Sequence, residues 1–392
     1  MQKLIRITTI PIALKNLLTG QMKYMTNNGF EVLMISADGE ERNAIVHDEG
    51  CKHIIVPLTR QITPFNDLKC LIQLIKIFKK EKPDIVHTHT PKAGLIGMLA
   101  AKICGVKCRI HTVAGLPLQT ATGFKKSILI FTEKLTGWAA SSILPNSNSL
   151  MKYAIERKLY NAQKIDIIGM GSSNGINLSR FDKSKLDILK LTKIKKSFTF
   201  DENKFYFLFV GRLVVDKGIL ELVTAFEQMQ KKYSNIELLL LGEFEQFRSE
   251  ESIDVQFRKK IQNNSNIKLL GWQNEVEYFF ASANILIHPS YREGFPNVLL
   301  QAGAMNCPII CSDIIGNIDI VEDNVDGLYF INKNIDSLFG KMEYAYNNMN
   351  KMEEYSSKLK QKIKNNFDRV IVQQKVLEFY KKTLRTNDTN YI

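Results

Sequence analysis

The 392-residue sequence lacks several features that define whole classes of protein. Its six cysteines form no CxxC pair and no CxxC-to-His spacing, which argues against structural zinc and is typical of reduced thiols in a cytosolic protein. With only 10 prolines and no internal repeat, the chain is neither collagen-like nor a solenoid. No apolar run approaches the length of a membrane-spanning helix. The apolar stretch from Ile7 to Leu14 is interrupted by Pro11, so we expect no secretion signal.

Positive charge is in excess, because 53 Lys and Arg face 40 Asp and Glu, giving a net charge of +13. Such an excess favours nucleic acid or an anionic membrane surface as a partner, unless it is only a solvated lysine-rich face. No zinc-finger, RNP or basic-zipper pattern is present, so we expect no nucleic acid partner. Lysines gather between Lys183 and Lys196, and Lys125 and Lys126 adjoin the apolar run Ile128 to Phe131, with Trp138 beyond. Cations beside aromatic residues suit the membrane interface.

Short β-branched runs alternate with amphipathic stretches along nearly the whole chain, which is typical of parallel α/β units. Apolar residues from Leu68 to Lys80 follow helical spacing. The strands predicted in the first half are Ile5–Ile10, Glu31–Ser36, His53–Leu58, Asp84–Thr90, Arg109–Val113 and Ser142–Ser147. Those predicted in the second half are Phe205–Val210, Ile236–Leu241, Ile267–Leu270, Ile285–His288, Ile309–Ser312 and Gly327–Phe330.

The two series of strands predict two doubly wound, Rossmann-like domains facing each other across a cleft, joined by a polar segment from about residue 172 to 203. We place the first domain at 1–172, completed by a C-terminal crossing helix at 370–392, and the second at 173–369. Ligands of such sheets bind beyond the carboxyl ends of the strands. The chemistry is therefore expected in loops that follow strands.

One such loop runs from Gly211 to Gly218, between a predicted strand and a helix. Gly211 permits a tight turn, while Arg212 and Lys217 place two cations near a helix N-terminus. Together they could hold a diphosphate and stabilise its charge as it leaves, although a turn with two surface cations would look the same. The loop has neither P-loop nor G-x-G-x-x-G spacing.

A second loop runs from His288 to Asn297 and leads into a predicted helix, Val298 to Met305. Pro296 suits a first helical turn, so the amides of Gly294 and Phe295 would point toward a ligand. Glu293 and Gln301 could bind different hydroxyls of a sugar-containing ligand. A capping Glu and an exposed Gln are the alternative.

These two loops resemble motifs of the retaining glycosyltransferases of family 4, or group 1, which have the GT-B fold. The family pattern G-R-L-x-x-x-K-G matches Gly211 to Gly218, and P-S-x-x-E-G-F-P-N-V-L-L-E matches Pro289 to Leu300. The resemblance spans nearly the whole chain, with the two motifs in order and about 80 residues apart. It implies that Arg212 and Lys217 bind the nucleotide diphosphate. Further donor-binding positions are implied at Gly211, Trp272, Gln273, Gly294, Phe295, Asn297 and Gln301.

The sequence departs from this family in two places. The second glutamate of the family pattern is replaced by Gln301 in this sequence, so an amide occupies the position that normally binds the ribose hydroxyls. A histidine that helps to place the donor sugar is absent at Ala114, so its role is vacant or falls to His111. We assign His87, His89, Lys92 and His111 to the acceptor side. His87 and His89 lack a third ligand at metal spacing, so we expect no metal site and no cofactor beyond the donor substrate.

The resemblance therefore implies a retaining glycosyltransferase that uses a nucleotide sugar, with catalytic roles for Arg212, Lys217 and Glu293. A UDP-N-acetylhexosamine donor and a lipid-linked saccharide acceptor of surface polysaccharide synthesis are favoured. The enzyme would be cytoplasmic and peripheral on the anionic inner face of the plasma membrane. The alternatives are a sugar-nucleotide-binding protein without transfer activity and a UDP-sugar epimerase of the same architecture. A nicotinamide dehydrogenase is disfavoured by the missing glycine fingerprint.

Overall fold

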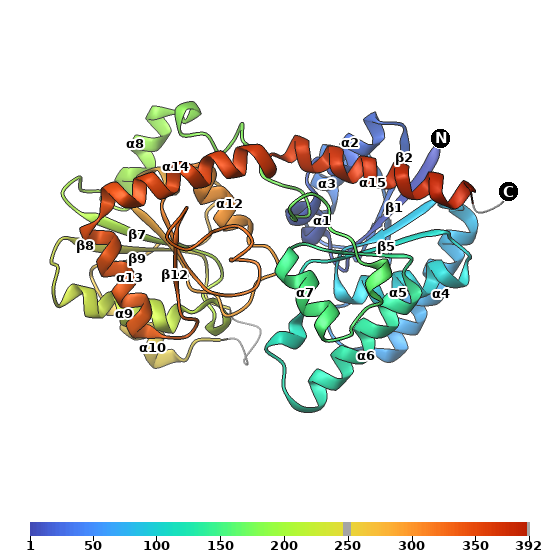
Figure 1. Ribbon diagram of the computed structural model, residues 1–392, viewed down its shortest axis with the longest axis horizontal. Helices are drawn as coiled ribbons and strands as arrows, with labels where there is room; N and C mark the ends of the chain where they lie inside the picture. Colours follow the sequence, from blue (N-terminus) through green and yellow to red (C-terminus); the bar gives the residue numbers. More distant parts are fainter. Residues whose placement is uncertain (246–251, 390–392) are drawn as a thin grey trace. The chain divides into compact units, whose positions relative to one another are not determined.

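A computed structural model describes residues 1–245 and 252–389 and divides the chain into two compact α/β units (Figure 1). Unit 1 comprises Met1–Gly175 and the C-terminal segment from Arg369, and unit 2 comprises Ile176–Asp368. Each unit is built on one six-stranded sheet in which all paired strands are parallel. The predicted pair of Rossmann-like domains is thereby confirmed. No helix within the described ranges has both the length and the apolar character of a membrane span.

Unit 1 has the strand order β3-β2-β1-β4-β5-β6, with helices packed on both faces of the sheet (Figure 1). Its strands are β1 Gln2–Ile7, β2 Phe30–Ser36, β3 Lys52–Ile55, β4 Ile85–Thr88, β5 Cys108–Val113 and β6 Ser142–Pro145. Its helices are α1 Pro11–Leu18, α2 Gln21–Asn27, α3 Arg42–Glu49, α4 Pro64–Glu81, α5 Pro91–Ile103, α6 Gly123–Ala139, α7 Asn148–Glu156 and α15 Arg369–Thr389.

Unit 2 has the strand order β12-β11-β10-β7-β8-β9. Its strands are β7 Phe205–Val210, β8 Ile236–Leu241, β9 Ile267–Leu269, β10 Ile285–His288, β11 Ile309–Ser312 and β12 Leu328–Phe330. Its helices are α8 Ile188–Ser197, α9 Ile219–Gln230, α10 Val255–Asn263, α11 Val276–Ser282, α12 Asn297–Ala304, α13 Ile335–Asn347 and α14 Met349–Asn366.

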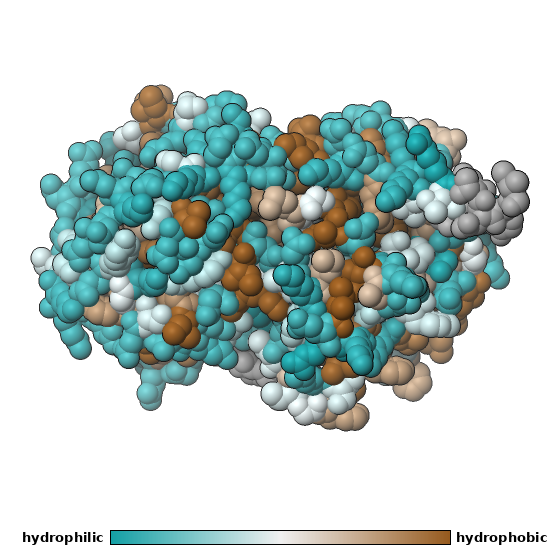
Figure 2. Space-filling view, in the orientation of Figure 1, coloured by the Kyte–Doolittle hydropathy of each residue, from teal (hydrophilic) through white to brown (hydrophobic). Residues whose placement is uncertain are grey.

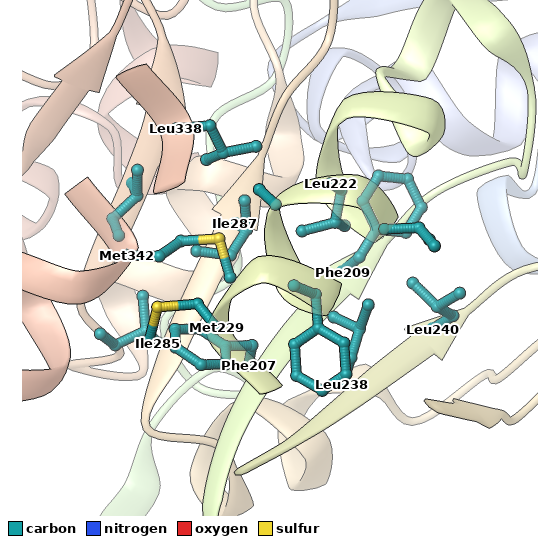
Figure 3. Close-up of a cluster of buried hydrophobic side chains, with 14 of the residues drawn as sticks. Phe207, Phe209, Leu222, Met229, Leu238, Leu240, Ile285, Ile287, Leu338 and Met342 are labelled. Atoms are coloured by element: carbon teal, nitrogen blue, oxygen red, sulfur yellow. The ribbon is translucent and has the colours of Figure 1, made fainter. Parts of the chain in front are cut away.

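Strands buried on both faces explain the continuous apolar runs in the sequence. In β7, Phe207 and Phe209 point to one side, where they pack with Leu222 and Met229 of α9 (Figure 3). Tyr206 and Leu208, at the alternating positions, belong to a second cluster on the opposite face. Both faces of the sheet are therefore sealed by helices, which leaves the strand ends as the places where polar loops gather.

Several predicted boundaries needed correction. The first strand was predicted at Ile5–Ile10 but runs from Gln2 to Ile7, because Pro11 opens α1 as its first residue. The helix predicted after Pro296 begins at Asn297, with Pro296 as its N-cap. The polar connecting segment contains a helix of its own, α8, none of whose side chains is buried.

Helix α15 is held on unit 1 by a fully buried polar cluster. The Arg6 guanidinium, on β1, donates to the hydroxyl of Tyr380 on α15. His87 Nδ1 lies 2.6 Å from the same hydroxyl, and its Nε2 lies 2.7 Å from Thr112 Oγ1. Burial lowers the pKa of Arg6 and raises that of Tyr380 to about 12. Tyr380 therefore remains a neutral phenol that satisfies a buried cation.

Replacing Tyr380 with Phe should destabilise unit 1, because the ring still fills its place while Arg6 loses a buried partner. We expect a loss of about 1–3 kcal/mol in the free energy of unfolding, measured by denaturant titration. Tyr344→Phe, at an exposed position of α13, is the matched control and should change stability by less than about 0.5 kcal/mol. Equal stability of the two variants would contradict this role for Tyr380.

Candidate functional site

The two motif loops of unit 2 are neighbours because of its strand order. Strand β7 pairs with β8 on one side and with β10 on the other. The direction in which successive strands are added to the sheet therefore reverses between β7 and β10. At such a switch point the two flanking loops diverge and open a crevice at the carboxyl edge of the sheet. Gly211 to Gly218 follows β7, and Pro289 to Pro296 follows β10. The structure thus places both sequence motifs where ligands of this fold class bind.

An ion pair between Lys217 and Glu293 joins the two loops. Glu293 Oε1 also accepts a hydrogen bond of 2.8 Å from Ser290 Oγ and lies 3.4 Å from His288 Nε2. Burial alone would raise the pKa of Glu293, but the Lys217 ammonium and the His288 ring hold that pKa well below its usual range. Burial lowers the pKa of His288. The Glu293 carboxylate is therefore ionised at neutral pH.

The contacts of Glu293 leave one oxygen for a ligand. All three neighbours meet Oε1, and Oε2 has no hydrogen-bond partner among residues 1–245 and 252–389. A carboxylate held at one oxygen by Lys217 and Ser290 has a fixed orientation. Glu293 is thus suited to accept a hydrogen bond from a hydroxyl group through Oε2.

Further contacts lock the same loops together. Arg292 Nε lies 3.0 Å from Asp216 Oδ2, and the Tyr291 amide donates to the Asp216 carbonyl at 2.9 Å. Gly218 has a left-handed backbone (φ +69°), and a Cβ there would stand 2.1 Å from the Pro289 carbonyl oxygen. Glycine is therefore required at the last position of the first motif, because the backbone of the second motif approaches it closely.

Arg212 lies in the same group of loops but is half-exposed. Its Nη1 lies 3.0 Å from Glu245 Oε2, a carboxylate that follows β8. Beyond β9, Trp272 exposes 63% of its surface, and Gln273 donates to the Leu270 carbonyl at 2.6 Å. The carboxyl ends of β7, β8, β9 and β10 thus present Arg212, Glu245, Trp272 and Glu293 from one edge of the sheet.

The remaining predicted donor positions lie at the start of α12. Asn297 is its first residue, and Gln301 lies one turn further along, half-buried. The side chain of Phe295 is buried against Phe367, with ring centroids 5.4 Å apart, so only its backbone can meet a ligand. Gly316 packs against Gly294, since a Cβ on Gly316 would lie 2.8 Å from the Gly294 carbonyl oxygen. This packing fixes the loop before the helix.

In unit 1, His87 near the carboxyl end of β4 and His89 just beyond it border a small cavity of about 20 Å³. Its polar lining also includes Gln21, Thr112, Asn146, Ser172 and Ser173. Both ring nitrogens of His89 are buried without a hydrogen-bond partner in the described structure. Burial and the nearby Arg6 charge hold the pKa of His89 well below its ordinary value, so the ring is neutral.

The other two acceptor-side candidates are separated from this cavity. His111 is buried beneath α5, where a Cβ on Gly94 would lie 2.4 Å from its ring, and its Nδ1 lies 2.8 Å from Thr88 Oγ1. Lys92 forms an ion pair with Asp67, at 2.7 Å. Of the four candidates, the structure brings only His87 and His89 together, with ring centroids 4.0 Å apart.

Sequence reasoning missed Asp216, Ser290, Arg292 and Glu245. The first three lie inside the two motif stretches, where only the strand order reveals that they face one another. Glu245 could have been suspected, because it closely follows the carboxyl end of a predicted strand.

Comparisons with known proteins agree with this geometry. Residues 191–365 match the family described as "Glycosyl transferases group 1", and residues 13–169 match "Glycosyl transferase 4-like". The chain is 34% identical over 387 residues to the capsular polysaccharide biosynthesis glycosyltransferase CapM of Staphylococcus aureus, covering 99% of each chain.

A second relative is the N,N'-diacetylbacillosaminyl-diphospho-undecaprenol alpha-1,3-N-acetylgalactosaminyltransferase of Campylobacter jejuni, 25% identical over 93% of this chain and 94% of that one. The chain is also 27% identical to the UDP-Gal:alpha-D-GlcNAc-diphosphoundecaprenol alpha-1,3-galactosyltransferase of Escherichia coli, over 82% and 81% of the two chains. Among solved structures, Anabaena HepE in complex with UDP and glucose is similar with a TM-score of 0.81, at 15% identity over 97% of this chain and all of that one.

Substituting Gly218 with Ala tests whether the two loops must touch. The new methyl group would collide with the Pro289 carbonyl, so the loops should separate and nucleotide binding, followed by thermal shift, should be lost. Gly105→Ala is the matched control, since Gly105 has the same backbone hand (φ +71°) with nothing near its missing Cβ. It should cost only about 1–2 kcal/mol of stability and keep binding. Similar behaviour of both variants would argue against loop contact.

Stability should fall as the pH drops from 6.5 toward 4. Burial lowers the pKa of His111 to about 4 and holds the pKa values of His87 and His89 well below their ordinary value of 6.5. In this pH range the unfolded chain therefore binds protons that the folded chain does not bind. The free energy of unfolding falls by up to about 1.4 kcal/mol per histidine and pH unit as a result. Melting temperatures between pH 8 and 4.5 would check this. A flat profile across that range would show that the histidines titrate normally.

Proposed function

The chain belongs to the group 1 glycosyltransferases, and from this premise we propose that it transfers a sugar from a UDP-linked donor bound by unit 2. The observation that carries the proposal is the meeting of Lys217 and Glu293 at the switch point between β7 and β10. One loop supplies cations and the other a carboxylate, which suit the diphosphate and the sugar hydroxyls of a nucleotide sugar.

Arg212 and Lys217 would hold the diphosphate. Arg212 offers two parallel N–H donors to phosphate oxygens, and Lys217 a compact positive charge. As the bond between the sugar and the phosphate breaks, negative charge develops on the leaving diphosphate, and fixed cations stabilise it without reorganisation. These two side chains would take the place of a metal ion, so we propose that transfer needs no metal.

Glu293 would position the donor sugar through Oε2, and the backbone amides of Gly294 and Phe295 would complete the site. Trp272 offers an exposed ring on which the base can stack, with Gln273 beside it. Asn297 and Gln301 lie at the start of α12, where a half-buried amide can contact ribose hydroxyls. We propose that the product retains the anomeric configuration of the donor.

The donor sugar and the acceptor are proposed from the relatives. Two of them are named for transfer to saccharides linked to diphospho-undecaprenol, one with galactose and one with N-acetylgalactosamine, and another for capsular polysaccharide synthesis. A UDP-N-acetylhexosamine donor and a lipid-linked saccharide acceptor of surface polysaccharide synthesis follow for this chain. Such an acceptor stays in a bilayer, so the enzyme would work in the cytoplasm as a peripheral protein on the anionic inner face of the plasma membrane.

Nucleotide binding is the first test. In a thermal-shift panel of UDP, GDP, ADP, CMP and dTDP sugars, UDP sugars alone should stabilise the protein. Arg212→Ala and Lys217→Ala should each weaken UDP binding about 10- to 100-fold, because each removes a charged contact to the diphosphate. Lys232→Ala is the matched control, since it removes a lysine of unit 2 from an ion pair with Glu343 outside the site. It should leave binding unchanged.

Transfer is the second test. Radiolabelled UDP-N-acetylgalactosamine should label undecaprenyl-diphosphate-linked N-acetylglucosamine in detergent, with or without a metal chelator. Glu293→Gln should lower the rate more than it weakens UDP binding. Binding without labelling of any lipid-linked acceptor would favour a sugar-nucleotide-binding protein. Stabilisation by none of the nucleotides would overturn the donor site.

A further inference from the structure

Helix α6 of unit 1 carries an exposed apolar stripe. Phe124, Phe131 and Trp138 expose 82%, 65% and 59% of their surfaces. Ile128 and Leu135 lie between them and are half-buried. The spacing of four and three residues places all five on one face of the helix over four turns. Figure 2 shows hydrophobic and hydrophilic residues side by side on the visible face of unit 1. An isolated exposed Phe is ordinary, but a continuous stripe marks an interaction surface.

The charge around this stripe is of one sign. The first turn of α6 contains Lys125 and Lys126 and no acidic residue, although helix N-termini favour carboxylates. The helix has one carboxylate, Glu133, which is buried and accepts a hydrogen bond from the Tyr160 hydroxyl. Burial raises the pKa of Glu133 to about 7, which further reduces its negative charge. The outward surface of α6 therefore carries lysines and apolar side chains but no exposed carboxylate.

The adjoining elements extend the same pattern. Helix α5, packed beside α6, has no acidic residue, and its Lys102 ammonium lies 4.4 Å from the centre of the Trp138 ring. Lys164 Nζ donates to the carbonyl groups of Gly137 and Ala140 at the end of α6, at 3.1 and 2.8 Å. Trp138 thus sits between cations, with its ring exposed.

These charges decide between the possible occupants of the surface. A second copy of the chain could match the apolar stripe, but it would bring Lys125 and Lys134 against the same lysines with no exposed α6 carboxylate to compensate. Anionic phospholipid headgroups neutralise lysines at the same depth at which Phe and Trp enter the interface.

We propose that the α6 surface, consisting of Phe124, Lys125, Phe131, Lys134 and Trp138, docks unit 1 onto an anionic lipid bilayer. This inference rests on the proposed function in that a lipid-linked acceptor requires the enzyme to reach a membrane. It identifies the surface that makes contact, and it separates α6 from α8, another basic helix. On α8, Ile188 and Leu189 are the only exposed large apolar residues, and Lys190 is engaged by Glu275.

Vesicle flotation tests the proposal. The full-length protein should bind vesicles of phosphatidylcholine with about 30% phosphatidylglycerol, and should not bind pure phosphatidylcholine. Phe124→Ser with Phe131→Ser, and Lys125→Glu with Lys134→Glu, should each weaken binding about tenfold or more. Ile188→Ser with Leu189→Ser on α8 is the matched control and should bind as the parent does. In a Trp272→Phe background Trp138 is the remaining tryptophan, and its emission should shift to the blue on anionic vesicles.

The outcomes are distinct. Unchanged binding of both α6 variants, or loss of binding in the α8 variant alone, would overturn the proposal. A dimer in sedimentation that the α6 variants convert to a monomer, without vesicle binding by the parent, would assign the stripe to a second copy. Transfer to an acceptor in detergent should be kept by the α6 variants. If the parent binds vesicles through α6 but transfers no sugar, the docking surface stands and the proposed function fails.

Discussion

The ion pair between Lys217 and Glu293 is the contact on which the site of unit 2 depends. It exists because the strand order makes β7 and β10 neighbours although their loops are far apart in sequence. Burial of Glu293 would be costly for a lone carboxylate, and Lys217, Ser290 and His288 together make its ionised form the stable one. A substitution at either residue would therefore change the charge of the site, the contact between the loops and the orientation of Oε2 together.

In unit 1 the buried charge is a cation, whereas in unit 2 it is a carboxylate. Among the residues that the structure describes, no carboxylate forms an ion pair with the fully buried Arg6, whose partners are the neutral Tyr380 hydroxyl and the neutral His87 ring. A second charge nearby would be repelled, which is why the pKa values of His87 and His89 are lowered beyond the effect of burial. The His89 ring beside the cavity is therefore a neutral hydrogen-bonding group, better suited to a hydroxyl than to a phosphate.

Much of this architecture could be predicted from the sequence, because continuous apolar strands and glycine-containing loops report directly on local structure. Phe205–Val210 and Ile285–His288 have the predicted bounds, and Arg212, Lys217 and Glu293 lie on one sheet edge as the motifs implied. What could not be predicted depends on packing between distant segments. Spacing alone does not show that His111 is buried beneath Gly94 or that Glu133 turns inward to Tyr160.

The charges near Gln301 suggest a reason for an amide at this position. Both cations of the site face carboxylates, Arg212 toward Glu245 and Lys217 toward Glu293. A diphosphate adds negative charge to a group that is already balanced, so each further carboxylate nearby would weaken its binding. In the proposed donor site, a glutamine at position 301 would keep a hydrogen-bonding group for ribose hydroxyls while removing one such charge. The departure from the family pattern is thus compatible with the proposed donor site, in which it would exchange a strong hydroxyl contact for weaker repulsion of the diphosphate.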